Sequence, residues 1–275
     1  MNIFLTFLNY CFNLNQLVFI GVQTMTNNNE LFENELPKKN TSFIYSVNAD
    51  GDSGAKSPIL HPFSDSYKET HTYMGVIDKV YGKDKNNENI TNVGPYRCVH
   101  FTITRPDIDD VITNYYYAII DSKLCFYYQD NTKGSKQFFL SPNELPIITL
   151  PIKENYSFES TNWTKFYLNL TETGISLAPR YESAKLESDQ CKLSLKIEAK
   201  TNLAFNNKSY ECYPINIKLI TKTGSFMTKA TTTIDIKRWY APEIKYYIKE
   251  EYNVFMDALI KSKGTVKKDL VDIIN

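Results

Sequence analysis

Short runs in which apolar and polar residues alternate recur along this chain, and they restrict its fold more than any other feature. In 191–197 leucine and isoleucine alternate with lysine and serine, and 215–219 repeats the pattern after a turn. Successive side chains on a strand point to opposite faces, so each run has one apolar and one polar face. The pattern predicts antiparallel strands that cover a core with one face.

Other strand candidates are rich in β-branched and aromatic residues and are bounded by Asn, Asp, Gly, Pro or Ser. They are 72–82, 96–104, 114–120, 124–130, 136–140, 146–152, 165–170 and 174–182. These runs follow one another through short turns, so they predict a meander rather than alternating strands and helices. We therefore predict an all-β antiparallel fold.

The longest regular unit, 191–220, predicts one hairpin. With a turn at Asn207–Lys208, Cys212 lies opposite Leu203 and Cys191 opposite Gly224, so the two thiols do not meet. The 5 cysteines are widely spaced and form no CxxC motif, which disfavours both a zinc site and a disulfide framework. We interpret them as small buried hydrophobic residues.

A second hairpin is predicted around RWYAPEIKYYIKEEY, Arg238 to Tyr252. Pro242 cannot donate to a strand ladder, so Ala241–Pro242 forms a corner between two strands. Trp239 and Tyr240 then end the first strand and cover the edge of the core. The structural motif comprises Arg238, Trp239, Tyr240, Pro242, Lys249 and Glu250. The following tail, 255–275, fits either a short C-terminal helix or a terminal strand.

The N-terminal part differs in composition. Residues 1–25 are apolar but interrupted by amides, and they lack a basic start and a small-residue cleavage site. They are a degenerate signal or anchor, an upstream extension before a natural start at Met25, or a poorly packed tail. We predict that residues 26–68 form a polar, loosely ordered arm with one strand at 42–47. Residues 69–275 are predicted to form an antiparallel β domain, which is either single or split into the sub-sheets 69–144 and 145–275.

Two patterns suggest metal binding, and neither fits. Oxygen-bearing side chains alternate from Asn48 to Asp52 as in a calcium loop, but Ser53 and Ile59 stand where Gly and Glu are needed, so we predict a plain turn. The histidines, which are His61, His71 and His100, have no ligand spacing. We predict no metal and no cofactor.

The RWYAPEIKYYIKEEY stretch resembles the closing hairpin of the TapB-like proteins, exported bacterial proteins related to the domain of unknown function 3108, which carry W-Y-x-P-x-φ-G-x-x-V-K-x-E. Segments 145–159 and 205–219 resemble further parts of that pattern. Lys245 replaces the Gly of the family and Phe158 its Trp. The likeness covers about residues 145–252. It implies a strongly curved antiparallel sheet or half-open barrel without catalytic residues, in the periplasm or cell envelope.

Few residues suggest chemistry. Cys98 and His100 share one strand face, where a histidine can activate a thiol, but no oxyanion element or orienting carboxylate accompanies them. Tyrosine clusters either line a pocket or form cross-strand pairs that hold the sheet, and we favour the second interpretation. The candidate ligand-binding residues are Tyr115, Tyr117, Tyr127 and Trp239.

Basic and acidic residues balance at 31 each, so no excess positive charge attracts phosphates and nucleic acid is not an expected partner. We expect a non-enzymatic binding or scaffolding protein of the bacterial envelope. Its partner is a protein or an apolar small molecule, and its N-terminus can associate with the membrane. The alternatives are a lipid carrier and a secreted effector or hydrolase. A start at Met25 implies instead a cytoplasmic protein or one secreted without a signal peptide.

Overall fold

The computed structural model describes residues 32–51, 65–83, 88–105, 111–169, 189–223, 230–257 and 261–275. The chain divides into two compact units, residues 1–36 and residues 37–275. All of the described strands belong to the second unit. The predictions for residues 1–25 and for a strand at 174–182 lie outside the described residues.

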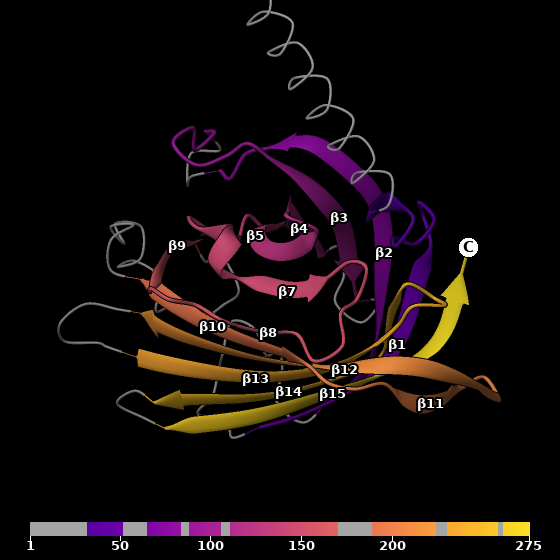
Figure 1. The fold of residues 1–275 in the computed structure, drawn as a ribbon. Helices are drawn as coiled ribbons and strands as arrows, with labels where there is room; N and C mark the ends of the chain where they lie inside the picture. The colour runs from indigo at the N-terminus through magenta and orange to yellow at the C-terminus, as the bar shows by residue number, and fades with distance from the viewer. Residues whose placement is uncertain are drawn as a thin grey trace, which may run out of the picture. The chain divides into compact units, whose positions relative to one another are not determined.

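The second unit is built from strands, and the predicted all-β antiparallel fold is confirmed (Figure 1). The strands are β1 (Ser42–Gly51), β2 (Asp65–Val80), β3 (Tyr96–Thr104), β4 (Ile112–Ile120), β5 (Lys123–Asn131), β6 (Lys136–Phe139), β7 (Pro146–Thr149), β8 (Ser157–Glu159), β9 (Thr164–Asn169), β10 (Gln190–Ile197), β11 (Thr201–Phe205), β12 (Lys208–Thr223), β13 (Ala230–Ala241), β14 (Tyr246–Asp257) and β15 (Ser262–Ile274). One 3-10 turn, η1 (Pro142–Glu144), precedes β7.

The strands close into an antiparallel barrel of 12 strands. The hydrogen-bonded order is β12–β13–β14–β15–β1–β2–β3–β4–β5–β6–β9–β10, and β10 pairs in turn with β12. Three further strands attach to this wall, because β7 pairs with β5, β8 with β10 and β11 with β12. The barrel is therefore closed rather than half-open, since β10 finds partners on both of its edges.

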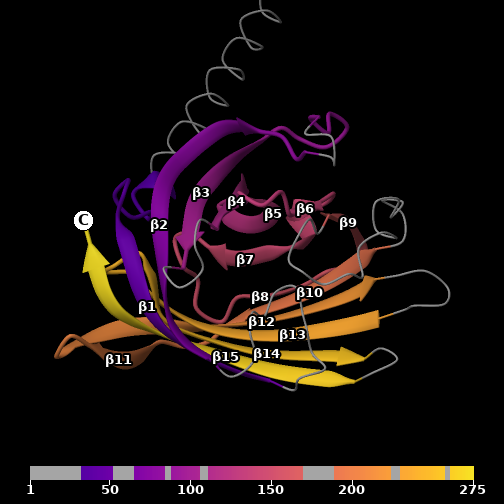
Figure 2. The ribbon, with the colours of Figure 1, turned by 180° about the vertical axis from the view of Figure 1, so that it is seen from behind.

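The N-terminal arm contributes directly to this wall. Its predicted strand is longer than expected and continues through Asn48 and Asp50, where a turn was predicted. As β1, it pairs with β2 on one edge and with β15, the last strand of the chain, on the other (Figure 2). Phe43, Tyr45 and Val47 are fully buried, because alternate side chains of β1 point into the barrel.

The interior next to β10 and β12 is filled by the chain itself. Every residue from Leu145 to Leu150 is buried, although an ordinary wall strand buries alternate residues only. This stretch contains β7, which lies between β5 and β10 in Figure 1 and pairs with β5. Ile147 and Ile148 point to opposite faces and are 2% and 1% exposed, so both faces of β7 are covered by protein.

The long hairpin has a different register from the predicted one. Its turn is Asn206–Asn207, with φ values of 49° and 58°, because asparagine tolerates the left-handed conformation of a two-residue turn. Cys212 therefore pairs with Thr201 rather than Leu203, and Cys191 with Thr221 rather than Gly224. The first arm is also broken into β10 and β11, and both pair with β12. The cysteines of the described residues are buried and free, as predicted.

The C-terminal tail forms β15, so the alternative of a short helix is wrong for the described residues. The corner at Pro242 is confirmed, with β13 ending at Ala241 and β14 beginning at Tyr246. A bulge shifts the register there, since Trp239 pairs with Lys249 but Tyr240 with Tyr247. Tyr247 is therefore buried instead of sharing a face with Lys249. No helix among the described residues is long and apolar enough to cross a membrane.

Candidate functional site

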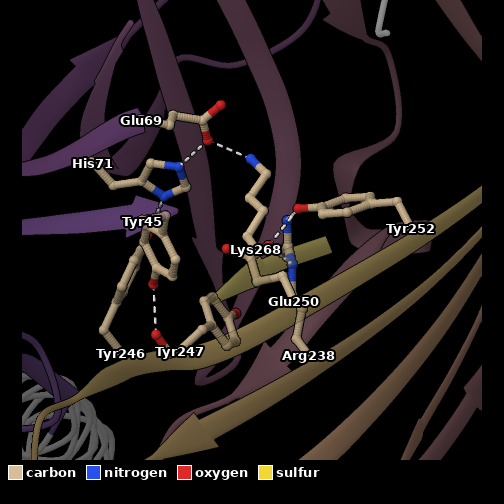
Figure 3. A network of polar contacts seen from close by, with 9 residues as sticks. All are labelled: Tyr45, Glu69, His71, Arg238, Tyr246, Tyr247, Glu250, Tyr252 and Lys268. Atoms are coloured by element: carbon tan, nitrogen blue, oxygen red, sulfur yellow. Dashed lines mark hydrogen bonds and ion pairs between the residues drawn. The ribbon is translucent and has the colours of Figure 1, made fainter. Parts of the chain in front are cut away.

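A cluster of charged and phenolic side chains lies inside the barrel (Figure 3). Its members come from neighbouring strands around β1, which pairs with β2 on one edge and with β15 on the other. They are Tyr45 on β1, Glu69 and His71 on β2, Arg238 on β13, Tyr246, Tyr247, Glu250 and Tyr252 on β14, and Lys268 on β15.

Strand register brings the charges together. Arg238 pairs with Glu250, and Glu250 pairs with Lys268, so three charged residues stand in one row across β13, β14 and β15. On the other side of β15, Lys268 is opposite Val47 of β1. Tyr45, two residues before Val47 and on the same face of β1, is opposite Glu69 of β2. Directly opposed side chains in a sheet are close enough to interact, so the row and Glu69 form one network.

One part of the network is centred on Glu250, which is 1% exposed. Arg238 Nε donates to Glu250 Oε2 at 2.8 Å, and Arg238 Nη2 donates to Tyr252 Oη at 2.8 Å. The Tyr252 hydroxyl in turn donates to Glu250 Oε2. The guanidinium group also lies 5.0 Å from the centre of the Tyr247 ring, within the range of a cation–π contact.

The other part is centred on Glu69, which is 5% exposed. Lys268 Nζ donates to Glu69 Oε1, and the same oxygen contacts Nε2 of His71. The second ring nitrogen of His71, Nδ1, lies 3.0 Å from the Tyr246 hydroxyl. This continuous chain joins a cation, a carboxylate, an imidazole and a phenol across three strands.

Opposite charges decide the protonation of this network. Burial alone would raise the pKa of Glu69, but Lys268 and His71 outweigh it and hold the pKa well below its usual range. Burial acts the same way on Glu250, and Arg238 and Lys268 lower its pKa despite it. Burial would lower the pKa of Lys268, yet Glu69 raises it. The carboxylates and cations are therefore all ionised near neutral pH.

These shifts predict an acid-sensitive fold. A carboxylate whose pKa is lower in the folded state than in the unfolded state stabilises the fold. This stabilisation is complete above about pH 5. It is lost as the pH falls below the pKa of the unfolded state, about 4.3, towards the pKa of the folded state. We expect the urea midpoint of the protein to fall between about pH 5 and pH 3. In Glu69→Gln the urea midpoint should decrease less steeply over this pH range, whatever its value at neutral pH.

The matched control is Glu243→Gln, because the Glu243 side chain is 57% exposed and pairs only with the exposed Lys208. The urea midpoint of Glu243→Gln should depend on pH in the same way as the midpoint of the unmodified protein. An unchanged slope in Glu69→Gln would mean that Glu69 does not titrate abnormally in the folded protein.

Aromatic rings extend from this network across the interior. The Tyr246 ring stacks on Phe43, with centroids 4.3 Å apart, and on Phe101, with centroids 4.9 Å apart. Phe101 contacts Tyr117, which stacks with Tyr115 at 6.1 Å. The rings join β14 and β1 to β3 and β4, so one continuous aromatic lining adjoins the charged groups.

Part of this lining is incompletely covered by protein. Some of its tyrosines retain surface accessible to water although burial raises the pKa of each hydroxyl; they are Tyr115, Tyr117, Tyr246 and Tyr252. For Tyr115 the pKa rises to about 12. Strand register and ring contacts give the direction of these side chains, because Tyr115 lies opposite Phe101 and Tyr246 stacks on the fully buried Phe43. Their side chains therefore point into the barrel.

The structure separates the sequence-predicted ligand residues. Tyr115 and Tyr117 lie on β4 in the aromatic lining. Tyr127 belongs to another cluster, with Val80 and Phe138, and its hydroxyl accepts from Gly82 N at 3.1 Å and donates to Val80 O at 3.2 Å. Trp239 is half-buried on the outer face of β13, so it does not cover the core edge.

Of the predicted motif around Trp239, Arg238 and Glu250 belong to the interior network, and Tyr240 is buried. Lys249 pairs instead with Glu251, with Nζ and Oε1 2.8 Å apart. Glu69, His71 and Lys268 were not predicted from the sequence as members of this site. The sequence did contain an indication of Lys268. On a strand this lysine lies on the same face as Val266 and Leu270, which are both buried.

Other candidate chemistry is placed elsewhere. Burial raises the pKa of the Cys98 thiol, the opposite of what a nucleophile needs, and its Sγ donates to Tyr96 O at 3.5 Å. His100 Nε2 lies 3.2 Å from Asn114 Oδ1, and its ring stacks on Tyr116. No group of three His, Cys, Asp or Glu residues in the described part of the chain could hold a metal ion. His61 lies outside that part.

Comparisons with known proteins leave the identity of the barrel open. No protein-family model matches the chain, and no curated protein and no solved structure matches it.

Proposed function

We propose that this chain is a non-enzymatic binding protein that holds a small, uncharged aromatic molecule with polar groups inside its barrel. The observation that carries the proposal is the incompletely covered tyrosine lining, whose side chains point into the barrel beside the buried ion pairs. Enclosed sites with aromatic walls and a few fixed polar groups are typical of small-molecule binding.

The charges favour a neutral ligand. Arg238 is balanced by Glu250, and Lys268 by Glu69, so an ionic ligand would have to break a buried pair. The hydroxyls of Tyr115 and Tyr117 are protonated at neutral pH, since burial raises their pKa values, so they can donate as well as accept hydrogen bonds. Their ring faces provide the apolar contact area for an aromatic group.

A lipid carrier is supported less well. An acyl chain needs an apolar cavity, and the aliphatic part of the interior is occupied by the buried residues of 145–150. The remaining lining carries ionised groups, whose loss of water an acyl chain could not compensate.

The envelope location and the TapB-like relationship are part of the proposal and depend on the sequence resemblance. One feature supports the resemblance, because Lys245 stands where the family favours Gly and has a φ of 58°. That is the left-handed conformation in which glycine is preferred. Cell fractionation, with N-terminal sequencing of the mature protein, tests the location, and a cytosolic protein that begins at Met25 would contradict it.

Binding can be tested with 4-hydroxybenzamide, a neutral polar aromatic molecule, and with benzoate and 1-decanol as anionic and apolar comparisons. We expect saturable binding of 4-hydroxybenzamide by calorimetry, and movement of the NMR signals of Tyr115, Tyr117 and Tyr252. Tyr115→Phe should weaken this binding about fivefold to tenfold, as expected for the loss of one hydrogen bond.

Tyr127→Phe is the matched control, because its hydroxyl contacts backbone groups in a separate cluster. It should bind 4-hydroxybenzamide as tightly as the unmodified protein. Tighter binding of 1-decanol would favour the lipid carrier. Absence of binding by all three probes, or shifts confined to residues outside the barrel interior, would contradict the proposed site.

A further inference from the structure

A hollow lies on the outer face of the wall, away from the tyrosine lining. It has a volume of about 370 Å³ and spans four strands. Its polar lining consists of Ser194 and Lys196 on β10, Asn216 and Lys218 on β12, Asp235 and Lys237 on β13, and Glu251 and Asn253 on β14. We call this hollow the outer groove.

Strand register arranges the outer groove in two parallel rows. Pairing across β10, β12, β13 and β14 sets the first row as Lys196, Asn216, Lys237 and Glu251, and the second as Ser194, Lys218, Asp235 and Asn253. Each row combines hydrogen-bond donors and acceptors at the spacing of neighbouring strands, about 4.8 Å. The floor is made by the buried residues Leu195, Ile217 and Ile236.

The charges of the outer groove are nearly compensated. Lys218 Nζ lies 4.0 Å from Asp235, Lys237 Nζ lies 3.9 Å from Glu198, and Glu251 accepts from Lys249 at 2.8 Å. A polyphosphate chain is bound by several uncompensated cations, so nucleic acid does not fit this charge pattern. An uncharged ligand that both donates and accepts hydrogen bonds fits it better, because it leaves the ion pairs intact.

Trp239 continues the same face beyond the first row. It is two residues from Lys237 on β13, so both side chains point outward. Its ring is half-buried and lies 5.1 Å from both Lys237 Nζ and Lys249 Nζ. An indole that retains accessible surface beside a polar groove offers a flat apolar patch and a single N–H donor.

We propose that the outer groove binds a carbohydrate chain. Sugar hydroxyl groups both donate and accept hydrogen bonds, which matches the amides of Asn216 and Asn253 and the paired charges between them. The apolar face of a pyranose ring matches the accessible indole surface of Trp239. The site is independent of the barrel interior, because its side chains are on the opposite face of the wall.

The proposal can be tested by calorimetric titration of the full chain with chitohexaose and maltohexaose as neutral oligosaccharides, hexagalacturonate as an acidic one, and the oligonucleotide dT6. We expect saturable binding of at least one oligosaccharide. Asn216→Ala should weaken it about tenfold, as expected for the loss of hydrogen bonds to one side chain. Trp239→Ala should weaken it by a similar or larger factor.

Asn48→Ala is the matched control, because Asn48 is an exposed amide on the outer face of β1, where it accepts from Ser66 at 2.7 Å. It should bind the oligosaccharide normally, and all three variants should bind 4-hydroxybenzamide as the unmodified protein does. Failure of every oligosaccharide to bind, tighter binding of dT6, or affinities unchanged by Asn216→Ala and Trp239→Ala would each overturn the proposal.

Discussion

Replacing Glu250 by alanine should lower the free energy of unfolding by about 3–5 kcal/mol, the largest effect that we expect from one polar side chain. The substitution leaves the guanidinium of Arg238 buried without its carboxylate partner and removes the acceptor of the Tyr252 hydroxyl. Urea unfolding followed by circular dichroism at pH 7 measures the loss.

A double substitution separates the cost of a broken pair from the value of the pair. Arg238→Met combined with Glu250→Leu removes both charges and fills a similar volume, so it should recover most of the stability lost in Glu250→Ala. As a control, Glu243→Ala, which breaks the exposed pair with Lys208, should leave the urea midpoint unchanged. Equal losses in the double variant and in Glu250→Ala would mean that the pair itself stabilises the barrel.

The second large effect concerns β7. Ile147→Ala and Ile148→Ala should each cost about 2–5 kcal/mol, because both faces of this strand are buried and each truncation leaves a cavity. Two adjacent residues of a wall strand point to opposite faces, so alanine at the inward one should lower the stability and alanine at the outward one should be tolerated. Chemical unfolding of the two variants therefore tests directly whether β7 is enclosed by protein.

Ile274→Ala provides the matched control, because this side chain on β15 is 53% exposed. Its unfolding free energy should change by less than about 0.5 kcal/mol. A small loss in either β7 variant would show that one face of β7 is accessible, and it would reopen the apolar interior to a lipid ligand.

Local pattern was enough to predict several elements of the barrel. The segment 96–104 was predicted as a strand and is β3, because β-branched and aromatic residues fill it and turn-forming residue types flank it in the sequence. Buried faces on β10 and β12 were also predicted correctly from alternation. Closure of the barrel was not predicted, because the pairing of β1 with β15 joins distant segments and leaves no local signal in the sequence.

The interior network explains why the sequence left helix and strand as alternatives at the C-terminus. Val266 and Leu270 are both buried on β15, but the inward position between them is occupied by Lys268. A lysine at this position interrupts the alternation of apolar and polar residues expected of a strand and leaves apolar residues at helical spacing. The same lysine that belongs to the candidate site therefore made the segment resemble a helix.

The outer groove was missed for a related reason. Its residues follow the ordinary polar face of each strand, and only the register across four strands brings them together. Trp239 was interpreted as a cover for the core because tryptophan is usually buried. Its position on the outer face means that Trp239→Ala should affect stability less than a core substitution does.

The position of β1 between β2 and β15 also sets the order of events during synthesis. The second edge of β1 has no partner until Ser262–Ile274 has left the ribosome, so the barrel cannot close before β15 has been synthesised. Until then β1 and β14 each present an unpaired edge, which is a template for aggregation. A chain that stalls before β15 would need a chaperone to cover those edges.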